Sequence, residues 1–235
     1  MNEARPRIAV VVFPGSCDDE DAALALQRVG ADPVLVWHGE PELPAGVAGA
    51  ILPGGFSYGD YLRCGAIARF APAMAAIERL ADQGAPVLGI CNGFQILCEA
   101  GLLPGVLLAN DTLRFTCRDV TVRVEQADAP FTSRCESGQR LVLPVKHGEG
   151  RFVVPPAALA ELEAAGQIVL RYEAGSNPNG ALADIAGVRN RAGNVMGLMP
   201  HPEHAVDPLL GSADGALLLG SLVDRAREHQ PTAVA

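Results

Sequence analysis

Short apolar runs alternate with helical patterns through the first hundred residues, and this alternation constrains the fold more than any other feature. Four runs have the length and composition of buried strands: 7–13, 33–37, 50–52 and 86–90. Three stretches have helical spacing: 18–29, with Asp18 or Asp19 as its cap, 66–83 and 92–100. Strands that alternate with helices imply right-handed crossovers. We therefore expect an α/β fold with an open, mainly parallel sheet flanked by helices.

The second half of the chain has a different pattern. Val120, Val122 and Val124 alternate with polar residues, which is the period of a half-exposed strand. Further strands are predicted over 141–145, 168–172, 185–189 and 195–199. Helical spacing recurs only over 156–165 and 214–228. The sequence thus predicts an antiparallel β extension of the sheet, within a single domain that spans residues 7–230.

Charge and composition exclude several classes of protein. The formal net charge is −9, which disfavours binding to nucleic acid. Lys146 is the only lysine, so the chain has no polybasic membrane anchor. No run approaches the roughly 18 apolar residues of a membrane span. The apolar run 8–13 is too short for a secretory signal, and we expect a cytoplasmic protein.

The six cysteines, at positions 17, 64, 91, 98, 117 and 135, do not suggest a disulfide scaffold or a metal site. The chain is long for a disulfide-stabilised fold, and none of the cysteines forms a C-x-x-C pair. We therefore predict no metal in this protein and consider each cysteine alone.

Cys91 lies between a predicted strand and a predicted helix, with Gly89 and Gly93 two residues to either side. This spacing is that of a nucleophile elbow, with cysteine in place of serine. The turn would expose the sulfur at the carboxyl end of the sheet, where open α/β folds bind ligands. The helix N-terminus would stabilise a thiolate, and the Asn92 N–H would face a developing oxyanion. Gln95 follows one helical turn later and faces the same pocket.

The alternative is that Cys91 is a small buried hydrophobic residue, as most cysteines are. The glycine spacing favours the nucleophile. The other five cysteines lack this context, and packing accounts for them; Cys98, for example, lies among apolar residues of a predicted helix.

A cysteine nucleophile requires a base, and the base requires a group that orients it. His201 is the best candidate because it follows the strand 195–199 and is bracketed by Pro200 and Pro202. An extended backbone would project His201 and Glu203 to the same side, where the carboxylate can hold the imidazole tautomer. His147, in a glycine-flanked loop, could also line the site. A solvated proline-rich loop is the alternative for 199–204.

A glycine-rich loop follows the strand 50–52. Gly54 and Gly55 are placed to supply a second oxyanion N–H, although a Gly-Gly pair alone indicates no more than a tight turn. The chain has no P-loop motif, and its first strand–helix turn is not G-x-G-x-x-G. The sequence therefore has no recognisable motif for binding ATP or a dinucleotide.

Taken together, these segments resemble the class I (triad) glutamine amidotransferases, in which Cys precedes His-x-Glu by about 110 residues. Four segments, supported by 177–180 and 99–104, are most similar to the glutaminase subunits of phosphoribosylformylglycinamidine synthase: 53–63, 89–97, 147–150 and 199–203. The resemblance runs from about Arg7 to Arg227. It implies a flavodoxin-like sheet.

The resemblance also implies the roles of the residues. Cys91 would be the nucleophile, His201 the general acid/base and Glu203 its orienting group. Gly54 or Gly55 with Asn92 would supply oxyanion N–H groups, and Gln95 would lie near the glutamine.

The same resemblance implies partners, and it makes ammonia production the activity expected of this chain. Ammonia is useful only where an enzyme has formed an activated electrophile with which it can react. This sequence has no recognisable ATP-binding motif with which to form one. The ammonia would pass to a synthetase subunit, PurL, assembled with the small subunit PurS. ATP and magnesium would be used by PurL, with no cofactor in this chain.

Two positions depart from the family pattern, and neither belongs to the triad. His204 stands where arginine is usual, and Ser16-Cys17 lacks the asparagine usually found between them. Three other readings stay open: an amidotransferase subunit of another pathway, a Cys-elbow hydrolase of the DJ-1/PfpI kind, and a non-enzymatic assembly subunit.

Overall fold

The computed structural model describes residues 5–127 and 129–229. Within these ranges, one sheet holds nine strands in the order β2-β1-β3-β4-β11-β10-β9-β6-β7. Their bounds are β1 (Arg7–Val12), β2 (Asp32–Trp37), β3 (Val47–Leu52), β4 (Val87–Ile90), β6 (Thr116–Val124), β7 (Arg140–His147), β9 (Ile168–Tyr172), β10 (Ile185–Arg189) and β11 (Val195–Leu198).

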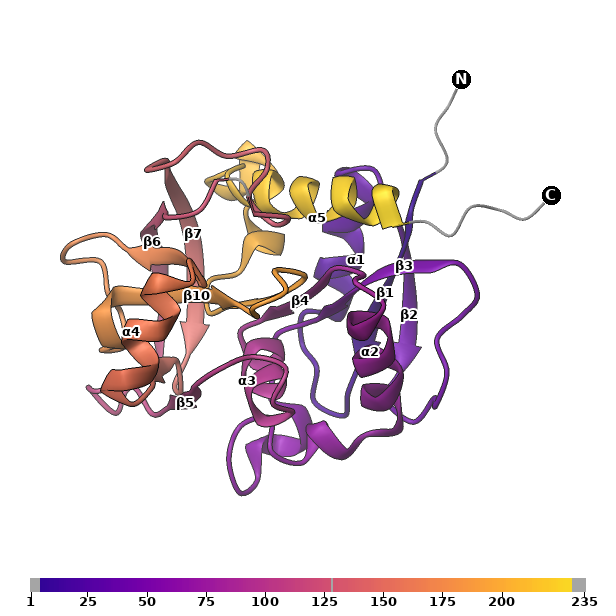
Figure 1. The fold of residues 1–235 in the computed structure, drawn as a ribbon, viewed down its shortest axis with the longest axis horizontal. Coiled ribbons are helices and arrows are strands. Elements are labelled where there is room, and N and C mark those ends of the chain that lie inside the picture. The colour runs from indigo at the N-terminus through magenta and orange to yellow at the C-terminus, as the bar shows by residue number, and fades with distance from the viewer. Residues whose placement is uncertain (1–4, 128, 230–235) are drawn as a thin grey trace.

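Helices cover both faces of the parallel part of this sheet. α1 and α5 pack together over β1, β2 and β3, while α2 and α3 cover the opposite face (Figure 1). α4 accompanies the antiparallel strands. The bounds are α1 (Asp19–Arg28), α2 (Pro72–Asp82), α3 (Asn92–Glu99), α4 (Pro156–Ala164) and α5 (Gly215–His229).

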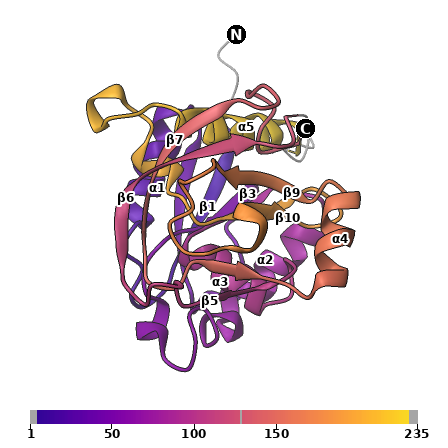
Figure 2. The same ribbon diagram turned by 90° about the vertical axis from the view of Figure 1, so that its left-hand side faces the viewer.

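The predicted fold class is confirmed. β2, β1, β3, β4 and β11 run parallel, and β10, β9, β6 and β7 continue the sheet in antiparallel pairs. The inner parallel strands are buried along nearly their whole length, because helices cover both of their faces. β7 alternates between buried and more exposed residues along its length, and β6 does so from Val120 onward; Figure 2 shows these long strands side by side.

The helix predicted over 66–83 is wrong in its first turn and a half. Residues Ala68–Phe70 form a separate 3₁₀ turn, and α2 begins only at Pro72. Ala71 is extended, with ψ 141°, because the proline ring excludes the helical conformation from the preceding residue. Pro72 itself suits the first helical position, where its missing N–H costs nothing.

Two further expectations were incomplete. Asp18 is the residue before α1, but its side chain makes no capping hydrogen bond there, because it is directed toward other partners described below. A two-stranded ribbon, β5 (Val106–Leu108) with β8 (Arg151–Val153), was not predicted. Its strands have three residues each, too few for a periodic signal.

The carboxyl ends of β1, β3, β4 and β11 meet at one edge of the sheet, because the four strands are parallel. The loops that leave these ends carry the predicted site residues. The predicted domain ends at residue 230, which lies just outside the described residues. No helix in the described part of the chain is long and apolar enough to cross a membrane.

Candidate active site

Cys91 occupies a sharp turn between β4 and α3. Its backbone has φ 50° and ψ −102°, a conformation that a non-glycine residue adopts only at a cost. Gly93 allows the turn to pack: a methyl group there would lie 1.9 Å from the carbonyl oxygen of Leu52. A methyl group on Gly89 would lie 2.6 Å from the backbone of Gly93. Strand and helix therefore approach closely only because both positions are glycine, as the elbow interpretation predicts.

His201 reaches the same place because β11 pairs with β4. Leu198 lies opposite Ile90, and the Cys91 N–H donates to the Leu198 carbonyl at 2.8 Å. His201 Nδ1 lies 2.6 Å from Glu203 Oε1, and both side chains are buried. The predicted contact between His201 and Glu203 is present, but the extended backbone predicted for both residues is wrong. Only His201 is extended, and Pro202–His204 form a 3₁₀ turn that brings Glu203 back toward the ring.

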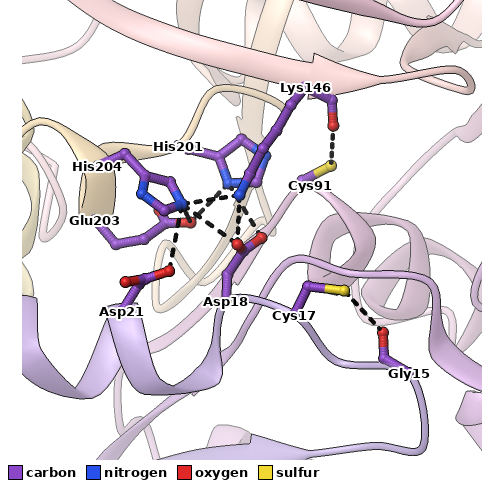
Figure 3. A network of polar contacts seen from close by, with 9 residues as sticks. All are labelled: Gly15, Cys17, Asp18, Asp21, Cys91, Lys146, His201, Glu203 and His204. Carbon is purple, nitrogen blue, oxygen red and sulfur yellow. Dashed lines mark hydrogen bonds and ion pairs between the residues drawn. The ribbon is translucent and has the colours of Figure 1, made fainter.

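The contact with Glu203 fixes the tautomer of His201. Nδ1 donates its hydrogen to the carboxylate, so Nε2 is the atom left to exchange a proton. Nε2 is buried, and it has no hydrogen-bond partner among the described residues. Burial disfavours the charged ring, but attraction to Glu203 and to Cys91 outweighs it and raises the pKa of His201 to about 10. Figure 3 shows Cys91 beside the imidazole, with the thiol directed toward the Lys146 carbonyl.

The glycine-rich loop after β3 is held against the loop after β1. Phe56 N–H donates to the Gly15 carbonyl at 2.8 Å, and Cys17 N–H donates to the Gly54 carbonyl at 3.1 Å. Gly55 lines the cavity that contains Cys91. Gly54 lies behind it, against Asp18 and His201, where a methyl group would be 2.3 Å from the Asp18 carboxylate. Of the two predicted oxyanion glycines, Gly55 is the one that faces the cavity.

Asn92 and Gln95 lie at the start of α3, as predicted, and both are buried. Asn92 is the first helical residue, so its N–H has no partner within the helix. Its side chain accepts a hydrogen bond from Ser57 N–H at 3.1 Å and donates to Gln95 Oε1 at 2.9 Å. Gln95 Nε2 donates to the Glu149 carbonyl at 2.6 Å. Gln95 thus lines the cavity while it also fixes the loop that closes the opposite wall.

The cavity beside Cys91 has a volume of about 170 Å³. Its wall combines the elbow, the glycine-rich loop and the loop after β7, and its lining residues include Gly55, Phe56, Asp60, Cys64, Cys91, Gln95, Phe115, Lys146, His147 and Glu149. A larger cavity of about 490 Å³ lies behind the site, between α1 and the segment 203–210. It includes Glu203 and His204 in its wall but not Cys91, so the smaller cavity, which Cys91 lines, is the one that serves the chemistry.

His147 lies in this wall, as the glycine-flanked loop suggested. Its Nδ1 contacts Asn110 Oδ1 at 3.2 Å, and its Nε2 contacts Asn179 Nδ2 at 3.3 Å. An amide oxygen accepts and an amide nitrogen donates, so the ring is neutral with hydrogen on Nδ1. Burial, together with the nearby His201, lowers the pKa of His147 to about 4. His147 is therefore a fixed neutral side chain beside the acid/base candidate.

Cys64 was assigned to packing, and the structure places it instead in the cavity wall. Burial and the neighbouring Glu149 and Asp60 carboxylates raise the pKa of the Cys64 thiol far above its usual range. Burial also raises the pKa of Asp60. No spacing in the sequence indicated these three residues. Asp60 and Glu149 lie within the segments 53–63 and 147–150, which was the available signal, and Cys64 follows directly after the first segment. Cys64 is a protonated thiol, so it does not compete with Cys91 as a nucleophile.

Four side chains could in principle hold a metal ion. Donor atoms of Asp18, His201, Glu203 and His204 lie within 4.8 Å of one another. The ammonium of Lys146 lies among them, hydrogen-bonded to Asp18 and 3.0 Å from His204 Nε2 (Figure 3). This protein cation already balances the carboxylates and would repel a second one. The geometry instead fits nucleophilic acyl transfer, with a thiol, an imidazole and an orienting carboxylate in sequence.

Comparison with known proteins gives a consistent result. The CobB/CobQ-like glutamine amidotransferase domain matches residues 5–214. The chain is 58% identical over 218 residues to the phosphoribosylformylglycinamidine synthase subunit PurQ of Frankia casuarinae, covering 92% of this chain and 93% of that protein. It is 55% identical over 227 residues to the subunit of the same name from Thermus thermophilus, covering 94% of this chain and all of the relative.

Solved structures extend the comparison. A chain of PurLQS from Thermotoga maritima superposes with a TM-score of 0.86 at 44% identity, covering 94% of this chain and 99% of that one. The glutaminase domain of Trypanosoma brucei CTPS with bound acivicin superposes with a TM-score of 0.61 at 18% identity, over 96% of this chain and 95% of that one. At that identity the second likeness concerns the fold alone.

Proposed function

This chain belongs to the family of CobB/CobQ-like glutamine amidotransferases, and from this membership and its site we propose how it works. It is the glutaminase subunit of phosphoribosylformylglycinamidine synthase, an enzyme of purine biosynthesis. It hydrolyses glutamine to glutamate and ammonia, and its partners are the synthetase subunit PurL and the small subunit PurS. The ammonia converts formylglycinamide ribonucleotide to its amidine on PurL.

The observation that carries the mechanism is the cavity in which Cys91 lies next to a histidine held by a carboxylate. In the first step, the Cys91 thiol passes its proton to His201 Nε2, and the thiolate attacks the side-chain amide carbon of glutamine, whose oxygen takes up the negative charge. The Gly55 and Asn92 N–H groups stabilise that oxyanion. His201 Nε2 then delivers a proton to the amide nitrogen, ammonia leaves, and a glutamyl thioester remains.

Hydrolysis of the thioester uses the same groups. His201 Nε2 takes a proton from water, the hydroxide adds to the thioester carbon, and Cys91 leaves as the thiolate to give glutamate. Glu203 keeps Nδ1–H directed away from the substrate through both steps, because its oxygen lies 2.6 Å from that atom. His147, neutral and fixed, adds no charge to the wall of the cavity.

Two further parts of the proposal concern the setting. No cofactor is required in this chain, because ATP and magnesium serve the PurL reaction. We expect the protein to act in the cytoplasm. The six cysteines are all free thiols, as suits a reducing compartment.

The test is active-site labelling with a glutamine-derived diazoketone, followed by peptide mass spectrometry. We expect one adduct, on Cys91, that excess glutamine prevents. Cys64 lies in the same cavity, so a Cys64→Ser variant is the matched control and should label normally. A Cys91→Ala variant should be folded, unlabelled and inactive. An adduct on Cys64, or normal glutamine turnover by Cys91→Ala, would contradict the assignment.

A further inference from the structure

A second carboxylate lies behind the catalytic pair. Asp18 is 2% exposed, and burying a charge costs free energy unless the charge is paired. Its Oδ2 lies 3.6 Å from His201 Nδ1, the same atom that contacts Glu203. The side chain forgoes the capping of α1 that its position would permit. An N-cap bond is thus replaced by a contact with the acid/base candidate.

Lys146 holds Asp18 in this position. Its ammonium is hydrogen-bonded to Asp18 Oδ1, and Oδ1 also lies 3.3 Å from His204 Nε2. The main chain of the same residue contacts the nucleophile, because the Lys146 carbonyl accepts from the Cys91 thiol with Sγ and O 3.8 Å apart. Lys146 therefore connects Asp18 on one side with Cys91 on the other.

We propose that Asp18, fixed by the ammonium of Lys146, is a positioning residue that acts through its charge: it lies beside the Nδ1–H that Glu203 holds, stabilises the imidazolium and increases the basicity of the His201 ring. This inference rests on the proposed function, because it concerns the acid/base group of that reaction. Asp18 does not itself line the cavity that contains Cys91, so it acts through His201.

The charges that face His201 come from every element packed around it. They are Glu203 and His204 of the 3₁₀ turn, Asp18 and more distantly Asp21 from the start of α1, Lys146 and the neutral His147 of β7, and Cys91 of the elbow. Glu203 and Asp18 stabilise the imidazolium, and Lys146 opposes them. Lys146 and His204 instead hold the pKa of Asp18 itself well below its usual range despite its burial, so Asp18 stays charged throughout the working range of pH.

The charges predict shifts of opposite sign for two variants. Asp18→Asn keeps the shape but removes a negative charge, so the pKa of His201 should fall. An unopposed charge at this distance would shift it by up to about 3 units, and Lys146 cancels part of this, so we expect about 1 unit. Lys146→Met removes the opposing cation and leaves Asp18 in contact with His204, so the pKa of His201 should rise. Asp21→Asn is the matched control, because Asp21 contacts His204 at 3.9 Å and not His201.

The measurement is an NMR titration of the full chain labelled in the Cε1 carbon of its five histidines, with the His201 signal assigned by its loss in His201→Gln. A fall in the pKa of His201 in Asp18→Asn, with no change in Asp21→Asn, supports the proposal. An unchanged pKa overturns it. If Asp18→Asn does not fold because Lys146 loses its counterion, the double variant Asp18→Asn/Lys146→Met is compared with Lys146→Met: a lower pKa of His201 in the double variant supports the proposal, and an equal pKa overturns it.

Turnover separates this inference from the proposed function. In the complex with PurL and PurS, kcat for glutamine hydrolysis by Asp18→Asn should fall with little change in KM. The alkaline limb of the pH profile should move down by about 1 unit, in step with the pKa of His201. A wild-type complex that does not hydrolyse glutamine would refute the proposed function. An active wild type with an identical profile for Asp18→Asn would refute only the role of Asp18.

Discussion

Substitution of Gly93 by alanine should damage both the stability and the activity of this protein. The added methyl group would lie 1.9 Å from the Leu52 carbonyl oxygen and 2.6 Å from its carbon. Ordinary contact begins near 3.4 Å, so α3 must move away from β3 by about 1.5 Å. The obstacle is backbone, which no side-chain rotation can relieve. Overpacking of this kind costs about 3 kcal/mol, or roughly 6–12 °C in Tm for a chain of this size.

The same movement displaces the start of α3, which carries Cys91 and the Asn92 N–H. A misplacement of about 1 Å at a reacting group can lower the rate about 100-fold, so kcat/KM for glutamine should fall by that order. Thermal unfolding followed by circular dichroism and glutaminase assays of the complex measure the two effects. Gly39→Ala is the control, because its methyl group would meet nothing closer than 3.4 Å. A Gly93→Ala variant with wild-type Tm and turnover would refute the argument that close packing positions the nucleophile.

Three other expectations follow from the site. Glu203→Gln removes the carboxylate that lies 2.6 Å from His201 Nδ1, so the pKa of His201 should fall in the histidine titration and kcat should drop by roughly 10²–10⁴-fold; an unchanged kcat would show that Glu203 does not orient the ring. The pKa of His147 is lowered from 6.5 to about 4, so the folded state resists its protonation. Stability should therefore be lost as pH falls from about 6.5 to about 4, by about 3 kcal/mol, and urea unfolding of His147→Gln should lack most of this loss. The buried thiols whose pKa is raised should react with iodoacetamide only after unfolding, and native labelling of any of them would contradict their burial: Cys64, Cys98 and Cys135.

Local sequence determined the elements and the elbow. Apolar runs and helical spacing identified all nine strands of the main sheet to within a few residues, because each signal lies within one short segment. The glycines around Cys91 predicted a close strand–helix turn, because that signal too lies within one short segment. One local signal was misread: Pro72 begins α2, and the extended Ala71 before it separates the helix from the preceding turn.

Contacts between distant segments could not be predicted in the same way, because they depend on how the strands are ordered in the sheet. β11 is inserted beside β4, and that pairing alone brings His201 to Cys91 across about 110 residues. The burial of Asp18 against Lys146 joins two residues from opposite halves of the chain. Such contacts depend on strand order and on the free energy of burying charge, which are properties of the whole packed chain. For that reason the nucleophile's turn could be predicted from one short segment, whereas the protonation of the histidines around it depends on the whole fold.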